Sequence, residues 1–177
     1  MSQGEKALYR ALDELGITYE RYEHPPAYTM EDCAGIDMGS AVHCKNLFLC
    51  NRQATEHFLL MVRSDKKFRT AEVSQQIEKS RLSFGSAEKL LEILGVEPGA
   101  VGPMGLINDT GGAVSLLMDV DLRGETLCVH PNVNTASIVL SYMDFEAFLR
   151  HTGHRPTFLH LEKSEDGVTK IENERGN

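Results

Sequence analysis

The apolar residues of this chain are gathered in short runs separated by polar turns, and this pattern limits the folds that are open to it. Runs 45–50 and 57–62 are joined by a polar connection, which predicts a β-hairpin. Runs 113–118, 126–129 and 135–140 are rich in Val, Leu, Ile and Thr, which also predicts strands. Helical segments fall between the strands irregularly and do not follow each one. The order therefore predicts a mixed α+β domain around a curved sheet and argues against a doubly wound Rossmann fold.

Helices are predicted where apolar residues recur at helical spacing between suitable end groups. The clearest starts at Ser86, whose hydroxyl can cap the first turn, and closes at Gly95, which suits the left-handed C-terminal position. A second apolar stripe runs from Leu8 to Leu15 and ends at Gly16. The remaining expected elements are helices at 29–34, 70–76 and 143–151 and short strands at 17–24 and 81–84.

The size and composition are those of one globular domain. The chain has 177 residues, of which 41% are hydrophobic and 25% charged, so it can bury a core without disulfides or metals. We place the domain at 1–161 and expect the polar, charged segment 162–177 to be disordered. No apolar run approaches the roughly 18 residues of a membrane span, and the N-terminus lacks the apolar core of a signal peptide. We therefore expect a cytoplasmic protein.

The charge distribution bears on nucleic-acid binding. A net charge of −8 argues against broad, non-specific binding to nucleic acid. Residues 63–69 are an exception, because they hold four cations in seven positions. This run is either a solvated surface or a patch that faces phosphate groups. Its cations are Arg63, Lys66, Lys67 and Arg69.

The familiar constellations of catalytic and metal sites are absent from the sequence. There is no GxSxG elbow, no P-loop, no HExxH pair and no Rossmann glycine fingerprint. The four cysteines show no CxxC spacing and are expected to be reduced thiols. His151 and His154 have no third ligand placed to complete a metal site. We therefore predict neither a metal nor a cofactor.

Two segments carry side chains suited to chemistry. Lys45 stands at the head of an apolar strand beside Asn46, and its ammonium either marks the solvent end of the strand or supplies a positive charge to a phosphate or a developing oxyanion. His130 lies between two predicted strands, and histidine is readily poised for proton transfer near neutral pH. A structural or merely exposed histidine is the alternative. Asn134 and Ser137 add neutral hydrogen-bonding groups to the same segment.

The third segment is the glycine-rich loop 99–105. Its proline stiffens the turn, while its glycines let the backbone approach a ligand and present bare N–H and C=O groups to a small polar substrate. An ordinary turn is the alternative reading. The loop residues expected to contact a substrate are Gly102, Pro103, Met104 and Gly105.

Taken together, these segments resemble the free-standing prolyl-tRNA editing family, also called ProX-type or YbaK-like. That family is related to the editing domain inserted in bacterial prolyl-tRNA synthetases. The resemblance covers about residues 5–160 and depends on the order and spacing of four pieces. They are Lys45–Leu49, Leu82–Phe84, the 99–105 loop, and the segment from His130 to Ala136.

The resemblance implies a mixed, mostly antiparallel, barrel-like sheet flanked by helices. It also implies a deacylase that hydrolyses the ester joining alanine to the 3′-terminal ribose of tRNA for proline. In that scheme Lys45 faces the terminal phosphate and the ester, the glycine-rich loop holds the aminoacyl group, and no cofactor is needed. The implied partner is the acceptor end of the tRNA, with transient contact to the synthetase or an elongation factor, and neither a membrane nor DNA. Gly102 departs from the pattern, because we expect a small hydroxyl residue there in many relatives.

Two alternatives stay open at the level of sequence. One is a deacylase for cysteine attached to the same tRNA, since sequence does not measure a pocket. The other is a non-catalytic tRNA-binding module, although the presence of both Lys45 and His130 counts against it. For His130 itself, proton transfer and shaping of the amino-acid pocket are both open, because no carboxylate lies within its segment to fix its tautomer.

Overall fold

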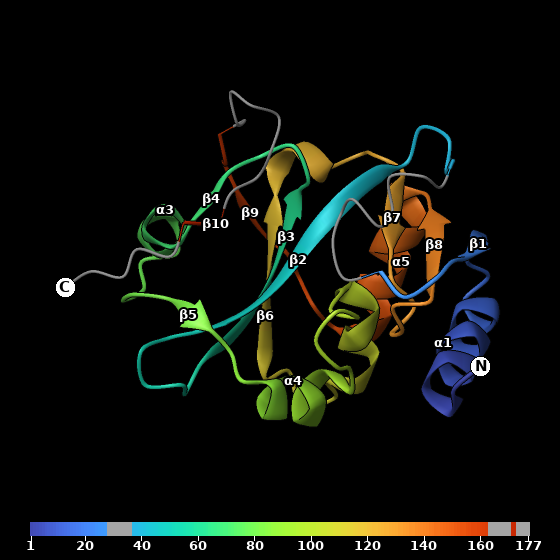
Figure 1. The fold of residues 1–177 in the computed structure, drawn as a ribbon, viewed down its shortest axis with the longest axis horizontal. Helices are drawn as coiled ribbons and strands as arrows, with labels where there is room; N and C mark the ends of the chain where they lie inside the picture. Colours follow the sequence, from blue (N-terminus) through green and yellow to red (C-terminus); the bar gives the residue numbers. More distant parts are fainter. Residues whose placement is uncertain (28–36, 163–170, 173–177) are drawn as a thin grey trace.

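The computed structural model describes residues 1–27, 37–162 and 171–172. Helices flank a mixed sheet (Figure 1). The helices are α1 (Gln3–Glu14), α3 (Thr70–Gln76), α4 (Ala87–Leu94) and α5 (Tyr142–Thr152), with 3₁₀ turns η1 (Pro103–Asn108) and η2 (Val120–Leu122). The strands are β1 (Tyr19–Glu23), β2 (Val42–Cys50), β3 (His57–Arg63), β4 (Phe68–Arg69), β5 (Ser83–Phe84), β6 (Val114–Asp119), β7 (Leu127–Val129), β8 (Ala136–Leu140), β9 (Thr157–Leu159) and β10 (Ile171–Glu172).

The main sheet has the strand order β1-β8-β7-β2-β3-β6-β9, with β5 added beside β2. The pairings β1–β8, β7–β8, β2–β3 and β2–β5 are antiparallel. The pairings β2–β7, β3–β6 and β6–β9 are parallel. The predicted α+β fold, with a mixed sheet flanked by helices, is confirmed.

Strand β2 holds the two halves of the sheet together. It runs diagonally across the molecule from β7 to β5, as Figure 1 shows. Its hairpin with β3 places Leu49 opposite Phe58 and Leu47 opposite Leu60, so the predicted hairpin is confirmed. The predicted strands at 113–118, 126–129 and 135–140 appear as β6, β7 and β8.

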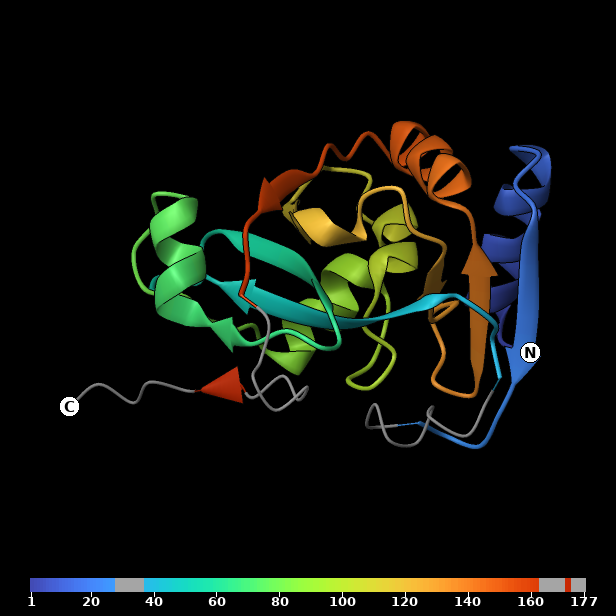
Figure 2. The same ribbon diagram turned by 90° about the horizontal axis from the view of Figure 1, so that it is seen from above.

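Strand alternation divides the buried side chains between two faces of the sheet. Phe48, Leu59 and Met61 belong to the main core, which α1, α4 and α5 cover. Leu60 and Val62 point the other way into a smaller cluster that includes Val73 of α3. Figure 2 shows α5 on one side of the sheet and the connection between β7 and β8 reaching past the other side.

The helix ends follow the predicted capping chemistry. The Ser86 hydroxyl accepts a hydrogen bond from the backbone N–H of Lys89 at 3.1 Å, and Gly95 closes α4 with φ of +66°. Ser141 caps α5 in the same way, and Gly153 ends that helix with φ of +80°. These local signals are reliable because each depends on residues three or four positions apart.

The structure adds elements that the sequence reading did not include. Strands β4 and β9 were not predicted, and β9 extends the sheet beyond β6. The expected helix at 29–34 lies outside the described residues. The expected disorder of 162–177 also falls mostly outside them, although Ile171–Glu172 is described and pairs with β4 in parallel. Within the described part of the chain, no helix is long and apolar enough to cross a lipid bilayer.

A buried ion pair joins the turn after β3 to the end of β6. The Lys66 side chain is 1% exposed, and its Nζ lies 2.8 Å from Asp119 Oδ1 and 2.6 Å from Asp121 Oδ2. Burial alone would lower the pKa of Lys66, but hydrogen bonds to the two carboxylates outweigh this effect and raise it. Asp119 also accepts the backbone N–H of Arg63 at 3.1 Å. This network holds the β3–β4 turn against the sheet.

Replacing Asp119 with alanine is expected to destabilise the fold strongly. The change removes the fully buried partner of a buried ammonium, and loss of one member of such a pair costs about 3–5 kcal/mol. Urea unfolding of the parent and of Asp119→Ala measures this difference. The control is Glu92→Gln, which breaks the exposed Lys89–Glu92 pair and should leave the unfolding midpoint unchanged. Similar midpoints for Asp119→Ala and the parent would contradict a structural role for the buried pair.

Candidate functional site

Strand β2 has a stretch of edge that no described strand covers. Along one edge β2 pairs with β3. On the other edge it pairs with β7 at Val42–His43 and with β5 at Leu49–Cys50. The glycine-rich loop approaches between these pairings, since a Cβ on Gly102 would lie 3.9 Å from Asn46 Nδ2 and 3.8 Å from the His130 carbonyl oxygen. Three of the predicted segments therefore meet at this gap.

Lys45 and Asn46 lie on opposite faces of β2 because successive strand residues alternate. Asn46 is opposite Met61, on the face of the main core, and so turns toward the glycine-rich loop. Lys45 is opposite Val62, on the other face, where His43 is its neighbour two positions earlier. Both Lys45 and His43 are half-buried. Lys45 and Asn46, although adjacent in sequence, therefore lie in two different environments.

A backbone carbonyl fixes the tautomer of His130. Its Nδ1 lies 3.0 Å from the carbonyl oxygen of Ala136. Because a carbonyl only accepts, the neutral ring carries its proton on Nδ1 and presents Nε2 as an acceptor. No carboxylate lies within the sequence segment of His130 to fix its tautomer. The Ala136 carbonyl does so instead, because the β7–β8 connection folds back on His130.

The surroundings of His130 favour its neutral form. Burial lowers the pKa of the ring below its usual value of 6.5, and the hydrogen bond to Ala136 opposes only part of this shift. Positive charge on His24 or His43 would lower it further. Burial also lowers the pKa of His43. Near pH 7 the imidazole of His130 is therefore a hydrogen-bond acceptor rather than a cation.

His24 is a site residue that the sequence analysis missed. Its ring centroid lies 6.2 Å from that of His130. Its Nδ1 is 2.9 Å from the Pro25 carbonyl oxygen, and its Nε2 is 2.9 Å from Ser137 Oγ. In the neutral ring Nδ1 donates to the carbonyl, so the Ser137 hydroxyl donates to Nε2. Ser137 is 2% exposed. The hydrogen bond that its hydroxyl makes in this structure is the one to His24.

The register of β1 on β8 explains why His24 reaches this place. Tyr22 pairs with Ser137, and His24 lies one alternation further along the same face. The backbone N–H of His24 donates to the Thr135 carbonyl at 3.0 Å. Next along the chain, the Ala27 N–H donates to the Asn134 carbonyl at 3.0 Å. Asn134 therefore ties the β7–β8 connection to the segment that follows β1.

The glycine-rich loop is held by close packing against α4. A Cβ at Gly105 would lie 3.1 Å from Leu94 Cβ and 3.2 Å from the Leu94 carbonyl oxygen, so a larger residue would require that neighbour to move. The Gly105 N–H donates to the Gly102 carbonyl at 3.2 Å, and Asn132 Nδ2 donates to the Met104 carbonyl at 3.4 Å. The side chain of Met104 is fully buried in the main core. Pro103 is also buried, at the start of η1. The predicted contacts of Met104 and Pro103 with substrate stay predictions.

Two amide oxygens near this loop are buried without a hydrogen-bond partner among the described residues. They are Asn46 Oδ1 and Asn132 Oδ1. Such atoms are uncommon in folded proteins and concentrate where a ligand or water completes the network. Gly102 is extended, and a Cβ there would make only ordinary contacts near the Asn46 amide. The space beside Asn46 therefore fits the small hydroxyl residue that we expect in many relatives.

The basic run at 63–69 does not form one phosphate-facing patch. Lys66 is buried between Asp119 and Asp121, so its prediction as a phosphate contact is wrong. Arg63 pairs with Asp65 through its Nε at 3.0 Å. Lys67 is half-buried and Arg69 is exposed. Only part of the run thus presents positive charge to solvent.

The described residues contain no group of three or more His, Cys, Asp or Glu side chains that would hold a metal ion. His154 contacts Asp109 instead of a metal, with 2.8 Å between Nε2 and Oδ2. Both side chains are buried. Among the described residues, the polar side chains near His130 include those of His24, His43 and Ser137, which are neutral or cationic and suit an anionic or ester substrate better than a cation.

Comparison with known proteins gives a consistent result. The sequence profile of the aminoacyl-tRNA editing domain matches residues 24–148. The prolyl-tRNA editing protein ProX of Acetoanaerobium sticklandii is 36% identical over 151 residues, which cover 84% of this chain and 92% of that protein. The prolyl-tRNA synthetase associated domain-containing protein 1 of Bos taurus is 32% identical over 163 residues, with 89% and 95% covered.

A solved structure shares the fold. It is described as a proposed trans-editing enzyme for prolyl tRNA synthetase, and it superposes with a TM-score of 0.67 at 18% identity over 93% of this chain and 99% of its own. The profile match includes His24, β2, the glycine-rich loop and the segment from β7 to β8. The chain belongs to the aminoacyl-tRNA editing domain family.

Proposed function

We propose that this protein hydrolyses the ester between a wrongly attached amino acid and the 3′-terminal ribose of tRNA for proline, and that alanine is its main substrate. The observation that carries the proposal is the arrangement around His130. The imidazole of His130 is held in its neutral form with its proton on Nδ1, and the backbone of His130 borders the gap where the glycine-rich loop meets β2, the strand that carries Lys45. The relatives, which include a protein named for prolyl-tRNA editing, support the choice of tRNA.

The chemistry needs no protein nucleophile, because an aminoacyl ester is already activated. Water attacks the ester carbonyl, the bond to the ribose 3′-oxygen breaks, and free amino acid and uncharged tRNA are released. The Lys45 ammonium stabilises negative charge on the developing oxyanion and on the nearby terminal phosphate. His130 Nε2 accepts a hydrogen bond from the attacking water or from the ribose 2′-hydroxyl and so positions it.

Selectivity in this proposal comes from the size of the amino-acid pocket. A synthetic site built for proline cannot strongly reject the smaller alanine, since missing methylenes cost only about 1–3 kcal/mol each. A second, smaller pocket admits alanine and excludes proline. The bare backbone at Gly102 leaves room for a slightly larger group, because a Cβ there would meet nothing closer than 3.8 Å. This room favours cysteine as a second substrate.

Lys45→Ala is expected to reduce the deacylation rate by about 10²–10³-fold, the usual cost of losing a preorganised charge contact. Its fold should survive, since the Lys45 side chain is only half-buried. Single-turnover hydrolysis of alanyl-tRNA for proline measures the effect. The matched control is Lys6→Ala, which removes the same charge from the exposed face of α1. A folded Lys45→Ala protein with a third or more of the parent rate would contradict the proposed role.

The pH dependence of hydrolysis should follow the protonation of His130. Burial holds the pKa of this group below 6.5, so the neutral form predominates at pH 7, and the rate should fall only as the pH drops through that lowered pKa. Between pH 7 and 8 the contribution of His130 should be constant. Rate profiles of the parent between pH 5 and 8.5 test this expectation.

Substitutions at His130 separate positioning from proton transfer. His130→Gln and His130→Asn keep a hydrogen-bonding group and are expected to retain more activity than His130→Ala. His130→Ala should also raise the hydrolysis of prolyl-tRNA relative to alanyl-tRNA, because it enlarges the pocket. If all three variants lose activity equally and the acid limb disappears with them, His130 is a proton-transfer catalyst and the pocket-shaping role is wrong.

The amino-acid preference is tested with alanyl, cysteinyl, seryl and prolyl esters of tRNA for proline. We expect alanine to be released fastest and proline slowest. Gly102→Ser fills the space beside Asn46 and should slow release of cysteine more than that of alanine. Faster hydrolysis of the cysteinyl ester by the parent would make cysteine the main substrate. Tight binding of charged tRNA with no acceleration of hydrolysis for any ester would favour a non-catalytic binding module.

A further inference from the structure

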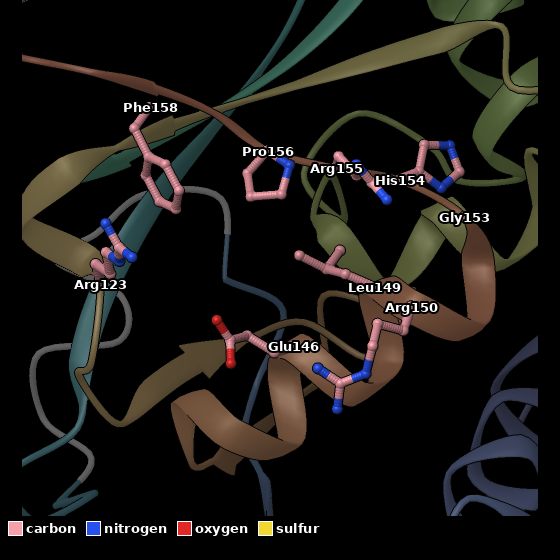
Figure 3. Close-up of a pocket in the computed structure, with 9 residues that line it drawn as sticks. All are labelled: Arg123, Glu146, Leu149, Arg150, Gly153, His154, Arg155, Pro156 and Phe158. Atoms are coloured by element: carbon pink, nitrogen blue, oxygen red, sulfur yellow. The ribbon is translucent and has the colours of Figure 1, made fainter.

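A hollow of about 520 Å³ lies between α5 and the connection that leads from α5 to β9 (Figure 3). Small-molecule sites in proteins occupy about 300–1,000 Å³. None of the residues assigned to the ester site lines this hollow. It lies on the α5 side of the sheet (Figure 2). His43 and Lys45 project from the opposite face of β2, because they alternate with the residues that face the main core.

The hollow is rich in positive charge within an acidic protein. Arg123, Arg150 and Arg155 line it together with Glu146, while the whole chain has a net charge of −8. All three arginine side chains are exposed, and within the described residues none of them has an ion-pair partner. Arg21, by contrast, has carboxylate partners at 2.9 and 2.6 Å. Three unpaired guanidinium groups around one hollow are suited to an anion.

The wall beside the arginines is flat and apolar. The guanidinium carbon of Arg123 lies 5.2 Å from the centre of the Phe158 ring, so the two groups form a stacked pair. Leu149, which is buried in the main core, forms part of the floor. An aromatic ring of a ligand can extend such a stack, because both guanidinium and aromatic planes accept a base on their faces.

The hollow is preformed by hydrogen bonds behind it. His154, which follows the end of α5, is held by Asp109 at 2.8 Å and by Thr152 Oγ1 at 2.9 Å. Asp109 also accepts the backbone N–H groups of Ala113 and Val114. On the far side β9 is paired with β6. The backbone that carries Arg155 is thus anchored, and little ordering is needed for a ligand to bind.

We propose that this hollow binds a nucleotide through its phosphate, either as a free nucleotide or as the 5′-phosphate end of an RNA. The guanidinium forks of Arg150 and Arg155 donate to phosphate oxygens with charge assistance. The Arg123–Phe158 stack carries the base. The carboxylate of Glu146, which faces the hollow in Figure 3, accepts hydrogen bonds from ribose hydroxyls.

Calorimetric titration of the full chain with four probes tests the proposal. The probes are AMP, adenosine, inorganic phosphate and a short 5′-phosphorylated RNA. AMP is expected to bind saturably and at least about tenfold more tightly than adenosine, because charge-assisted contacts to phosphate are the stronger ones. RNA that binds and displaces AMP identifies a nucleic-acid end as the ligand, and binding of AMP alone identifies a free nucleotide. No saturable binding of either AMP or RNA overturns the proposal.

Matched double variants locate the binding. Arg150→Gln with Arg155→Gln should weaken AMP binding at least about tenfold. Arg10→Gln with Arg52→Gln removes the same charge from exposed positions on α1 and the β2–β3 turn and should leave the affinity within about twofold. Glu146→Gln should tighten binding of inorganic phosphate, since it removes the carboxylate from the hollow. Equal losses in the two double variants, or no change in the first, would overturn the assignment of the site.

Discussion

The change of partner along one edge of β2 is the constraint on which the rest of the structure depends. One edge of this strand is paired continuously with β3, while the other passes from β7 to β5. Buried backbone groups between those partners need other hydrogen bonds, and the chain supplies at least one where the Gly85 N–H donates to the Phe48 carbonyl at 2.9 Å. The glycine-rich loop approaches the same interval beside Asn46. Among the described strands, the sheet is therefore incomplete beside Asn46 and the backbone of His130.

Buried polar groups differ in their hydrogen-bond partners between the scaffold and the candidate site. In the scaffold they are paired: Lys66 contacts two carboxylates, and Asp109 accepts from His154 and from two backbone N–H groups. Burial would raise the pKa of Asp109, but those hydrogen bonds outweigh it and lower that pKa. The stability contributed by Asp109 is therefore present near neutral pH and is lost as the pH falls through its lowered pKa.

Near the glycine-rich loop, by contrast, the amide oxygens of Asn46 and Asn132 have no partner among the described residues. Incomplete satisfaction of this kind is expected where a fold keeps groups ready for a ligand.

The protein has two polar surfaces on opposite sides of the main sheet. On one face of the sheet, β1, β2 and β8 place His24, His43 and Ser137 near His130, and Lys45 projects from the same face of β2 as His43. On the other, Arg150 of α5, Arg155 of its connection to β9 and Arg123, which follows η2, line a hollow. Both surfaces carry positively charged side chains, although the chain as a whole is acidic. An acidic protein with local positive sites resists indiscriminate binding to nucleic acid while still recognising defined phosphate groups.

The sequence by itself determined the features that depend on near neighbours. The hairpin of β2 and β3, the strands β6 to β8 and the caps at Ser86 and Gly95 are encoded by periodicity and by residues three or four positions apart. Residue type and order along the chain also make Lys45, His130 and the glycine-rich loop candidates for the site, and their roles stay predictions.

Only the tertiary structure decided which of these groups share a surface. Lys45 and Asn46 are adjacent in sequence but face opposite sides of β2, and His24 joins His130 through the register of β1 on β8. Lys66 looked like part of a basic patch, yet folding buries it against Asp119, a residue 53 positions away. The tautomer of His130 likewise depends on the Ala136 carbonyl, which is brought to it by the return of the chain. Pairing register and burial are set by contacts between distant segments, so no local pattern of residues encodes them.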